Sequence, residues 1–497
     1  MLKSTIDQAW ALLAAGRAEQ ALALTTPLAA ELPSVDLLSV HASGLKALGR
    51  ADEALAWDRR TVARFPQGRV AWHNLAATLG DLGCADEAVA AARQAFALGL
   101  DAPETWLVYA RALAASGDAA AAVDAFRQTI RRNPRNPAPA TELAELLWTS
   151  EADLTGALGV LRAAEAVGAP PIPLILKEAA VLRAAGQAEA AITCLTKAAR
   201  ARPGDTALAL AAADALLRAD RAEAALTAIQ PALAAHASHP AVAAQLSWIQ
   251  SALGRGRDAL ATAQAGLAAS PQSQALLNAL ATGARLTGDP RHEALYDYDA
   301  FVMDAMIETP RGWDNLDAYL SDLAAALVRL HGARGPPTEQ SLQGGSQTTF
   351  RLSGHPDPAI QAFFRAIDAP LRTYMARLGT GADPLRSRNT HGWRIAGAWS
   401  VLLRSGDFHR DHVHSEGWLS SAFYVAVPAA ALAAETREGW LRLGQPPFRT
   451  EPPLTLERHL RPTPGKLVLF PSYMWHGTEP FTTDESRVTI AFDVLPA

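Results

Sequence analysis

The sequence is poor in cysteine, and this limits the kinds of site that it can contain. Cys84 and Cys194 are the only two cysteines among 497 residues. A disulfide framework or a thiolate metal site needs several cysteines at suitable spacing. Both residues fall in stretches with a helical pattern, where cysteine commonly serves as a small buried hydrophobic side chain. We therefore expect neither a disulfide framework nor a thiolate-bound metal.

The sequence also lacks an excess of positive charge and long apolar runs. The net charge is −5 and the isoelectric point is near 6.2, whereas nucleic-acid binding depends mainly on clustered Lys and Arg. Residues 227–254 belong to the longest uncharged stretch, but Gln, Ser, His and Pro interrupt it, so it lacks the roughly 20 apolar residues of a membrane span. Asp7 interrupts the first apolar run before it can form a signal-peptide core. We expect no nucleic-acid partner, no membrane segment and a cytoplasmic location, with periplasmic export as the alternative.

A repeat of 33 to 35 residues fills the first three-fifths of the chain. Turn residues recur at this spacing at Gly16, Gly49, Gly83, Gly117, Ala152, Gly186, Asp220 and Gly254. An alanine stands five residues after each of them, at Ala21, Ala54, Ala88, Ala122, Ala157, Ala191, Ala225 and Ala259. Such a period indicates stacked helix–turn–helix units, in which a small residue lets two helices cross closely. Pro66, Pro134, Pro203 and Pro271 are expected to open the following helices.

The spacing and the segment Leu48-Gly-Arg-Ala-Asp-Glu-Ala54 resemble the tetratricopeptide repeat. The resemblance covers about residues 5–288 and implies an all-α superhelix of about eight repeats over residues 1–290. It also implies a concave face that binds a protein or an extended peptide. A bare spacer or a dimerisation arm is the alternative.

A change in pattern follows residue 290. Residues 291–335 carry an apolar stripe at helical spacing, formed by Leu316, Leu320, Leu323, Ala324 and Leu327, and are interpreted as a helical cap and linker. Strand-like runs then occur at 398–403, 419–427, 466–470 and 487–494. Short β-branched and aromatic runs separated by Gly and Pro indicate an antiparallel β-sandwich or jelly roll, with flanking helices, over residues 336–497.

Histidines with the spacing of metal ligands occur in this last part. A facial iron site takes two ligands two residues apart and a third from a distant strand. Three overlapping pairs fit, namely His409 with Asp411, His412 with His414, and His414 with Glu416. His476, in the turn after Phe470-Pro-Ser-Tyr, is the distal candidate.

The order of strand, glycine turn and ligand pair resembles the ligand strand of prolyl-hydroxylase-like oxygenases. This resemblance makes His412 the first ligand and puts His414 in the place of the usual carboxylate. Three imidazoles would leave the centre one charge more positive than a site with a carboxylate, and Asp411 or Glu416 could supply the missing anion. Whether Asp411 or Glu416 contributes a carboxylate to the metal site stays open at this point.

Several segments together are similar to the 2-oxoglutarate/Fe(II) oxygenase family found behind tetratricopeptide repeats. They are Gln343–Thr348, Trp399–Val401, His412–His414, Gly417–Ser420, Tyr424–Pro428, Phe470–His476 and Arg487. The resemblance implies Fe(II) held by His412, His414 and His476, with O₂ and 2-oxoglutarate as co-substrates. In such an enzyme Arg487 would pair with the distal carboxylate of 2-oxoglutarate, and Thr489 would donate from the same strand face.

The expected function is therefore a 2-oxoglutarate-dependent dioxygenase that hydroxylates a protein or peptide recruited by the repeats. Two alternatives remain. One is a non-catalytic repeat scaffold with a degenerate metal-binding barrel, and the other is a three-histidine cupin enzyme that does not use 2-oxoglutarate.

Overall fold

The computed structural model describes residues 2–168, 170–332, 335–338, 340–348, 352–433 and 435–497. The chain forms two compact units, Met1–Leu146 with Ala163–Pro170, and Leu147–Arg162 with Pro171–Ala497. The second unit combines later repeat helices with the C-terminal β domain. The division thus falls inside the repeat array, and not at residues 290 or 336, where the sequence pattern changes. None of the helices in the described part has both the length and the hydrophobicity needed to cross a bilayer.

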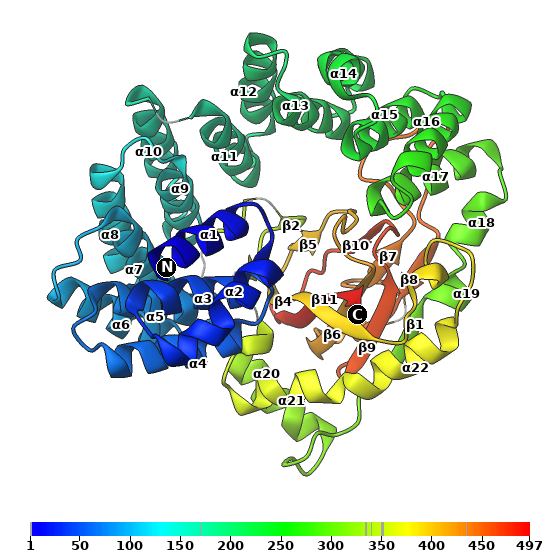
Figure 1. Ribbon diagram of the computed structural model, residues 1–497. Helices are drawn as coiled ribbons and strands as arrows, with labels where there is room; N and C mark the ends of the chain where they lie inside the picture. Colours follow the sequence, from blue (N-terminus) through cyan, green and yellow to red (C-terminus); the bar gives the residue numbers. More distant parts are fainter. Residues whose placement is uncertain (1, 169, 333–334, 339, 349–351, 434) are drawn as a thin grey trace. The chain divides into compact units, whose positions relative to one another are not determined.

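The repeat region consists of helices joined by tight turns (Figure 1). Their bounds are α1 (Leu2–Ala14), α2 (Ala18–Glu31), α3 (Val35–Ala47), α4 (Ala51–Arg64), α5 (Arg69–Asp81), α6 (Ala85–Ala97), α7 (Pro103–Ala115), α8 (Ala119–Arg132), α9 (Pro137–Glu151), α10 (Leu154–Ala166), α11 (Pro171–Ala184), α12 (Ala188–Ala201), α13 (Thr206–Arg218), α14 (Ala222–His236), α15 (Pro240–Ala252), α16 (Gly256–Ala269) and α17 (Gln274–Thr287). The predicted tetratricopeptide array is confirmed.

The turns and the alanines of the repeat lie as predicted. Every one of the eight turn residues has a positive φ, including the non-glycines Ala152 (56°) and Asp220 (57°). This left-handed conformation lets the chain reverse in a few residues, and glycine adopts it without steric cost. The eight alanines are buried, none more than 4% exposed. The small side chain therefore stands where paired helices meet.

The prolines have a different role from the one predicted. Pro66 lies three residues before α5 and not at its start. The N–H of Gly68 donates to the carbonyl of Phe65 at 2.8 Å, so Pro66 is the second residue of a four-residue turn. The other three prolines occupy the same place in equivalent turns. Proline suits this position because its ring fixes φ near the value that the turn requires.

The C-terminal domain is an antiparallel jelly roll with flanking helices, as expected. Its main sheet has the order β1-β9-β6-β11-β4-β3, a smaller sheet has the order β10-β7-β8, and β2 pairs with β5. The strands are β1 (Met303–Met306), β2 (Leu342–Gln343), β3 (Ser346–Gln347), β4 (Trp393–Leu403), β5 (Phe408–His409), β6 (Leu419–Ala426), β7 (Leu441–Leu443), β8 (Arg458–Leu460), β9 (Lys466–Pro471), β10 (His476–Thr478) and β11 (Arg487–Pro496). All four predicted strand-like runs are strands.

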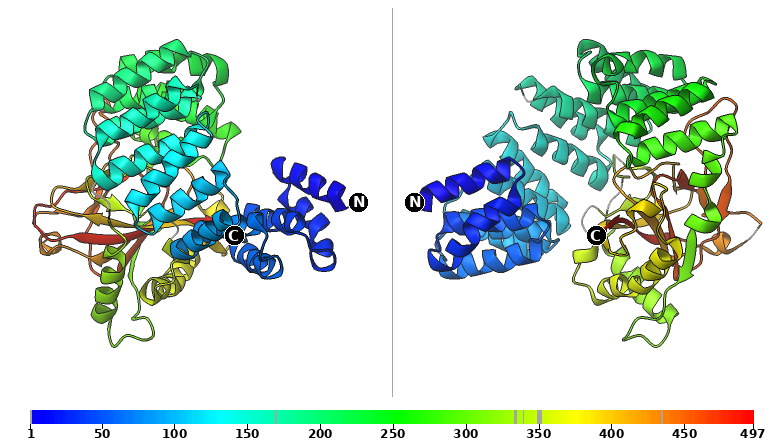
Figure 2. Two further views of the ribbon diagram at one scale, coloured as in Figure 1. Left: turned by 90° about the vertical axis from the view of Figure 1, so that its left-hand side faces the viewer. Right: turned by 45° about the vertical axis from the view of Figure 1, so that its right-hand side comes forward.

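Helices cover one face of the main sheet (Figures 1 and 2). They are α20 (Leu316–Val328), α21 (Pro358–Ala366) and α22 (Asp368–Leu378), while α18 (Arg291–Leu295), α19 (Tyr298–Phe301), η1 (Leu352–Gly354), η2 (Arg386–Arg388) and η3 (Ala429–Leu432) are shorter. Phe363 of α21 packs on Phe423 of β6, with ring centroids 4.7 Å apart. Residues of the opposite face, such as Thr489 and Ala491 of β11, line a cavity.

The segment 291–335 differs from the helical cap that was expected. It contains the predicted helix α20, but Met303–Met306 forms β1 and pairs with β9 at the edge of the main sheet. The buried stripe of α20, with Leu320 and Leu323, belongs to the core of the β domain. Much of this segment is therefore built into the C-terminal domain, because its apolar residues are buried against the sheet.

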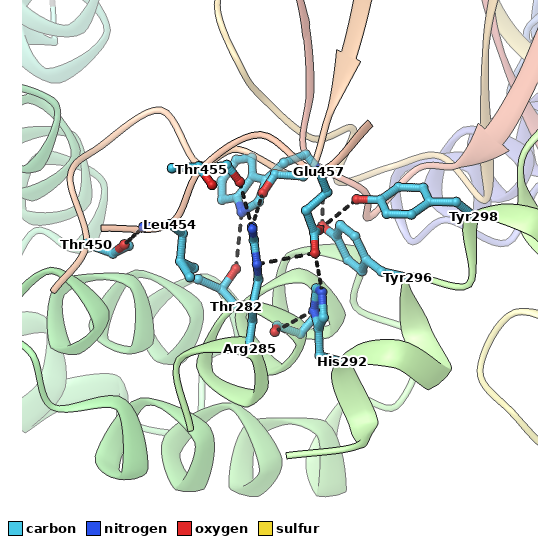
Figure 3. Close-up of polar contacts among 12 residues, drawn as sticks. Thr282, Arg285, His292, Tyr296, Tyr298, Thr450, Leu454, Thr455 and Glu457 are labelled. Carbon is cyan, nitrogen blue, oxygen red and sulfur yellow. Dashed lines mark hydrogen bonds and ion pairs between the residues drawn. The ribbon is translucent and has the colours of Figure 1, made fainter. Parts of the chain in front are cut away.

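The last repeat helices are joined to the β domain by buried contacts. Trp475 and Phe448 lie in one apolar cluster with Leu216 of α13 and Ile249 of α15. Figure 3 shows a polar network beside it. Glu457 accepts from Tyr298 at 2.8 Å and lies 3.2 Å from Nε of Arg285 in α17. The later repeats and the jelly roll consequently form a continuous packed body.

Candidate metal centre and its cavity

The three histidines predicted as ligands are brought together at the smaller sheet. His476 begins β10, and His412 follows β5 and pairs with His476 in an isolated antiparallel bridge. Their backbones exchange two hydrogen bonds, of 2.9 and 3.1 Å. The N–H of His414 donates to the carbonyl of Ser472 at 3.1 Å. Backbone pairing between segments that are distant in the sequence therefore fixes all three positions.

The imidazole rings face one another closely. The ring centroids of His412 and His476 are 4.2 Å apart, and those of His414 and His476 are 5.0 Å apart. The Nε2 atoms of His412 and His414 are separated by 3.1 Å. One nitrogen from each ring lies within 4.8 Å of the others, which makes this a group that could hold a metal ion. The separations suit a small divalent cation placed among the three nitrogens.

Each ring has its Nδ1 atom committed to a protein acceptor. Nδ1 of His412 lies 2.8 Å from the carbonyl oxygen of Arg410, and Nδ1 of His476 lies 2.9 Å from that of Met474. Nδ1 of His414 lies 2.6 Å from Oδ1 of Asp493. Because a carbonyl oxygen can only accept, Nδ1 of His412 and His476 must carry the proton, which leaves the Nε2 lone pair for a metal.

The electrostatics of the centre keep two of the imidazoles neutral. Burial, followed by the proximity of other histidines, holds the pKa of His412 well below its usual value. The pKa of His476 is lowered well below its usual value for the same reasons. A metal binds the neutral imidazole, so these shifts favour metal binding over protonation.

The two carboxylates considered as ligands, Asp411 and Glu416, lie outside the histidine cluster. Asp411 is buried, and its two carboxylate oxygens accept from Nε and Nη2 of Arg442 at 3.0 and 2.6 Å. Glu416 is exposed and accepts from Ser415 at 3.4 Å. Neither joins the cluster of possible metal ligands found among the described residues. Asp411 is instead one half of a buried ion pair.

His409, the remaining candidate from the ligand segment, stands beside the cluster. Its Nδ1 lies 3.0 Å from Oγ of Ser341, which is also 3.2 Å from Nε2 of His412. Burial lowers the pKa of His409 to about 3, and the charge of Arg487 contributes. The Ser341 hydroxyl thus links this neutral ring to the candidate ligand His412.

Asp493 is a site residue that was missed in the sequence. Besides its contact with His414, its Oδ1 accepts from Oγ of Ser420 at 2.9 Å. Asp493 therefore places a carboxylate directly behind one of the three candidate ligands. The strand pattern could have identified Asp493, because alternate residues of a strand share one face. The alternate residues of β11 that line the cavity are Arg487, Thr489, Ala491 and Asp493.

Arg487 is buried with unsatisfied donors. It is only 3% exposed, and its Nε and Nη1 atoms have no hydrogen-bond partner in the described ranges. The hydroxyl of Tyr424 is likewise buried and unpaired among those residues, and the Arg487 guanidinium carbon lies 5.2 Å from the Tyr424 ring centroid. Burial lowers the pKa of Arg487. Unpaired buried donors of a charged group cost roughly 1–3 kcal/mol or more, so this place favours an anionic ligand.

The histidines and Arg487 share one cavity of about 690 Å³. Thr489, 7% exposed, lies on its wall between Arg487 and Asp493 along β11. The ring of Tyr424 is buried, and its hydroxyl adds a donor next to Arg487 that the sequence did not reveal. The cavity has room for a metal, a small dicarboxylate and part of a further molecule.

The turn that carries His476 is held by the last repeat. Asn278 of α17 donates from Nδ2 to the carbonyl of Tyr473 at 2.9 Å, and the hydroxyl of Tyr296 donates to the same oxygen at 3.2 Å. The N–H of Trp475 donates back to the Tyr296 hydroxyl at 2.9 Å. All of these groups are buried. A repeat helix therefore helps to fix the backbone on which a candidate ligand stands.

Two family models match separate parts of the chain. Residues 397–493 match the family model described as "Putative 2OG-Fe(II) oxygenase", and residues 103–146 match that of the tetratricopeptide repeat. The resemblances to the tetratricopeptide repeat and to the 2-oxoglutarate/Fe(II) oxygenase family are thereby confirmed. No curated protein matches the chain.

Solved structures with similarity include pilF of Pseudomonas aeruginosa, at 18% identity over 41% of this chain and 92% of that one, with a TM-score of 0.34. A thermophilic TPR protein of Thermus thermophilus is 23% identical over 37% of this chain and 100% of its own, with a TM-score of 0.30. A chain of the APC/C hetero-tetramer Cut9–Hcn1 is 17% identical over 56% and 55% of the two chains, with a TM-score of 0.33. At scores below 0.5, these likenesses do not bear on function.

Proposed function

We propose that this chain, in which tetratricopeptide repeats precede a domain of the 2OG-Fe(II) oxygenase family, is an Fe(II)- and 2-oxoglutarate-dependent dioxygenase that hydroxylates a protein or peptide. The observation that carries the proposal is one cavity with two complementary features. Three histidine Nε2 atoms are available to a metal, and a buried arginine with unpaired donors is available to a carboxylate. Iron is the metal that the family match suggests.

The residues present fit both groups. His412, His414 and His476 would hold Fe(II), and the charge of Asp493, through His414, would offset part of the metal's charge. Arg487 would pair with the distal carboxylate of 2-oxoglutarate, with Tyr424 and Thr489 as further donors. When bound, iron supplies the oxidative chemistry in which 2-oxoglutarate and O₂ yield succinate and CO₂ and a substrate C–H bond is hydroxylated.

The contributions of the chain itself are positioning and desolvation. The carbonyls of Arg410 and Met474 keep the proton on Nδ1 of two candidate ligands. The backbone bridge between His412 and His476 sets their separation before any metal binds. Burial of Arg487 strengthens its pairing with a carboxylate, because the interaction is formed away from bulk water.

The test is the formation of succinate from 2-oxoglutarate, measured with and without Fe(II) and O₂. We expect turnover in the wild type and its loss in His476→Ala and Arg487→Ala. His459→Ala is a matched histidine control, because His459 contacts Glu479 in the smaller sheet and does not line the cavity. Arg394→Ala is a matched arginine control on the exposed part of β4. Normal turnover in His476→Ala or Arg487→Ala would contradict the proposal.

A second candidate function is favoured by the lack of a carboxylate in the ligand cluster found among the described residues. A three-histidine cupin enzyme could use the same metal without 2-oxoglutarate. It predicts metal-dependent oxygen consumption that is indifferent to Arg487→Ala. A non-catalytic scaffold predicts folded protein without metal-dependent turnover of either kind.

The repeats are proposed to recruit the protein or peptide substrate, which is the role that such arrays generally have. A cytoplasmic location stays a prediction from the sequence.

A further inference from the structure

The cavity of the candidate centre is not built by the β domain alone. Arg183 of α11 and Asp214 and Arg218 of α13 line the same cavity as the three histidines. These helices are the first members of two consecutive repeat pairs, and they lie outside the family match at 397–493. A molecule that extends from the metal centre across the cavity would therefore contact repeat residues directly.

Arg218 is held so that part of its guanidinium stays free. Its Nε lies 2.9 Å from Oδ1 and 2.8 Å from Oδ2 of Asp214. Within the part of the chain that the structure describes, neither Nη atom of Arg218 has a hydrogen-bond partner. Asp214 thus orients the planar group by one edge. The two Nη atoms remain able to bind a carboxylate or phosphate in the paired geometry that arginine favours.

Two other guanidiniums face the same space. Arg410 lines the cavity from the β-domain side, with an exposed side chain that has no hydrogen-bond partner among the described residues. Arg183 is held by a bond from Nη2 to the carbonyl of Thr338 at 3.1 Å, among other contacts. Asp214 offsets part of the charge of Arg218, but the three guanidiniums outnumber this one carboxylate, and an anion between them would reduce their mutual repulsion.

We propose that Arg183, Arg218 and Arg410, here called the arginine wall, bind an acidic group of a peptide substrate. The inference rests on the proposed oxygenase function and adds to it what the substrate must carry. The group is a carboxylate or a phosphate, since both match the guanidinium edge. It is a second anionic group besides the carboxylate that Arg487 would bind, because Arg487 is buried within the β domain whereas Arg410 is exposed. An extended peptide lying across α11 and α13 would place such a group beside the metal centre.

The test is peptide binding to the full-length protein loaded with Mn(II) and 2-oxoglutarate. Fluorescence anisotropy would compare labelled peptides of equal length that alternate alanine with glutamate, phosphoserine, glutamine or lysine. The variants are Arg218→Gln and Arg410→Gln. Because Arg410 is exposed, its replacement should not disturb folding. Arg221→Gln is the matched control, since Arg221 pairs with Glu189 at 2.7 Å and does not line the cavity.

We expect the glutamate or phosphoserine peptide to bind, and each wall variant to bind it about tenfold to a hundredfold more weakly, as for loss of a hydrogen bond to a charged group. The Arg221→Gln protein should bind like the wild type. The stronger of the two acidic peptides identifies the source of the anion. Equal binding of the glutamine peptide, no binding of either acidic peptide, or unchanged affinity in both wall variants would overturn the inference.

The same preparations distinguish this failure from failure of the proposed function. Succinate formation in the wild type together with indifference to peptide charge would remove only the arginine wall. Absence of succinate formation together with charge-dependent peptide binding that needs Arg218 would remove the oxygenase proposal and keep the binding site.

Discussion

Replacement of Asp493 should weaken metal binding without loss of the fold. Imidazole ligands bring no negative charge to balance a divalent cation, and Asp493 is the carboxylate that contacts one of the three rings, 2.6 Å from Nδ1 of His414. Asp493→Asn keeps an oxygen that can accept from Nδ1 but removes the charge. Asp493→Ala removes both. The pair of variants therefore separates orientation of the ring from charge compensation.

The expected magnitude follows from the place of Asp493 behind a candidate ligand. Loss of such a supporting partner typically weakens metal affinity by about 10- to 100-fold. We expect Asp493→Asn near the lower value, because the hydrogen bond to His414 can persist, and Asp493→Ala near the upper one. The bond from Ser420 at 2.9 Å also loses its acceptor in Asp493→Ala, so that variant should lose some stability as well.

Titration with Mn(II), followed by the loss of the free-ion electron paramagnetic resonance signal, measures this affinity directly. Asp304→Asn is the control, because Asp304 is an exposed carboxylate on β1 of the same sheet, paired with Lys466. Circular dichroism verifies that each variant is folded. Unchanged Mn(II) affinity in both Asp493 variants would refute the idea that this carboxylate supports the metal centre.

Two further predictions concern the repeats. Asn278→Ala should weaken Mn(II) binding as well as lower the melting temperature, because Asn278 holds the Tyr473 carbonyl next to His476; a lower melting temperature with unchanged affinity would contradict the positioning role. Burial raises the pKa of Asp58 to about 6 from its ordinary value of 3.8, against the bond from Thr78. Because the pKa of Asp58 is raised in the folded state, its contribution to the free energy of unfolding is fully present below pH 3.8. This contribution is lost as the pH rises through about 6, by up to about 3 kcal/mol. Asp58→Asn should therefore stabilise the protein more at about pH 8 than at about pH 5 in thermal denaturation. An equal rise in melting temperature at the two pH values would contradict the raised pKa of Asp58.

Local features of the fold could be predicted from the sequence because single residues determine them. A left-handed turn residue followed by a buried alanine is required in every repeat, so periodicity revealed both. The prolines were assigned to the wrong position because proline suits a helix start and the second residue of a turn equally well. Only the backbone bond from Gly68 to Phe65, and its equivalents, distinguish the two.

Long-range features of the site were not accessible in this way. The pairing of Asp411 with Arg442, and the contact of the missed residue Asp493 with His414, join positions that are 31 and 79 residues apart in the chain. The presence of Arg218 in the cavity depends on the packing of α13 near the β domain, which no motif encodes. The segment that forms β1 was obscured because an edge strand of four residues has no distinct periodicity.

The central claim is that one cavity holds both Fe(II) and 2-oxoglutarate. Anaerobic titration of the protein with Fe(II) and then 2-oxoglutarate, in the wild type and in Arg487→Ala, tests it most directly through the weak visible charge-transfer band of the chelate. We predict a band in the wild type and a requirement for far more 2-oxoglutarate in Arg487→Ala. Iron binding without a band, or a band that forms equally well in Arg487→Ala, would contradict the claim.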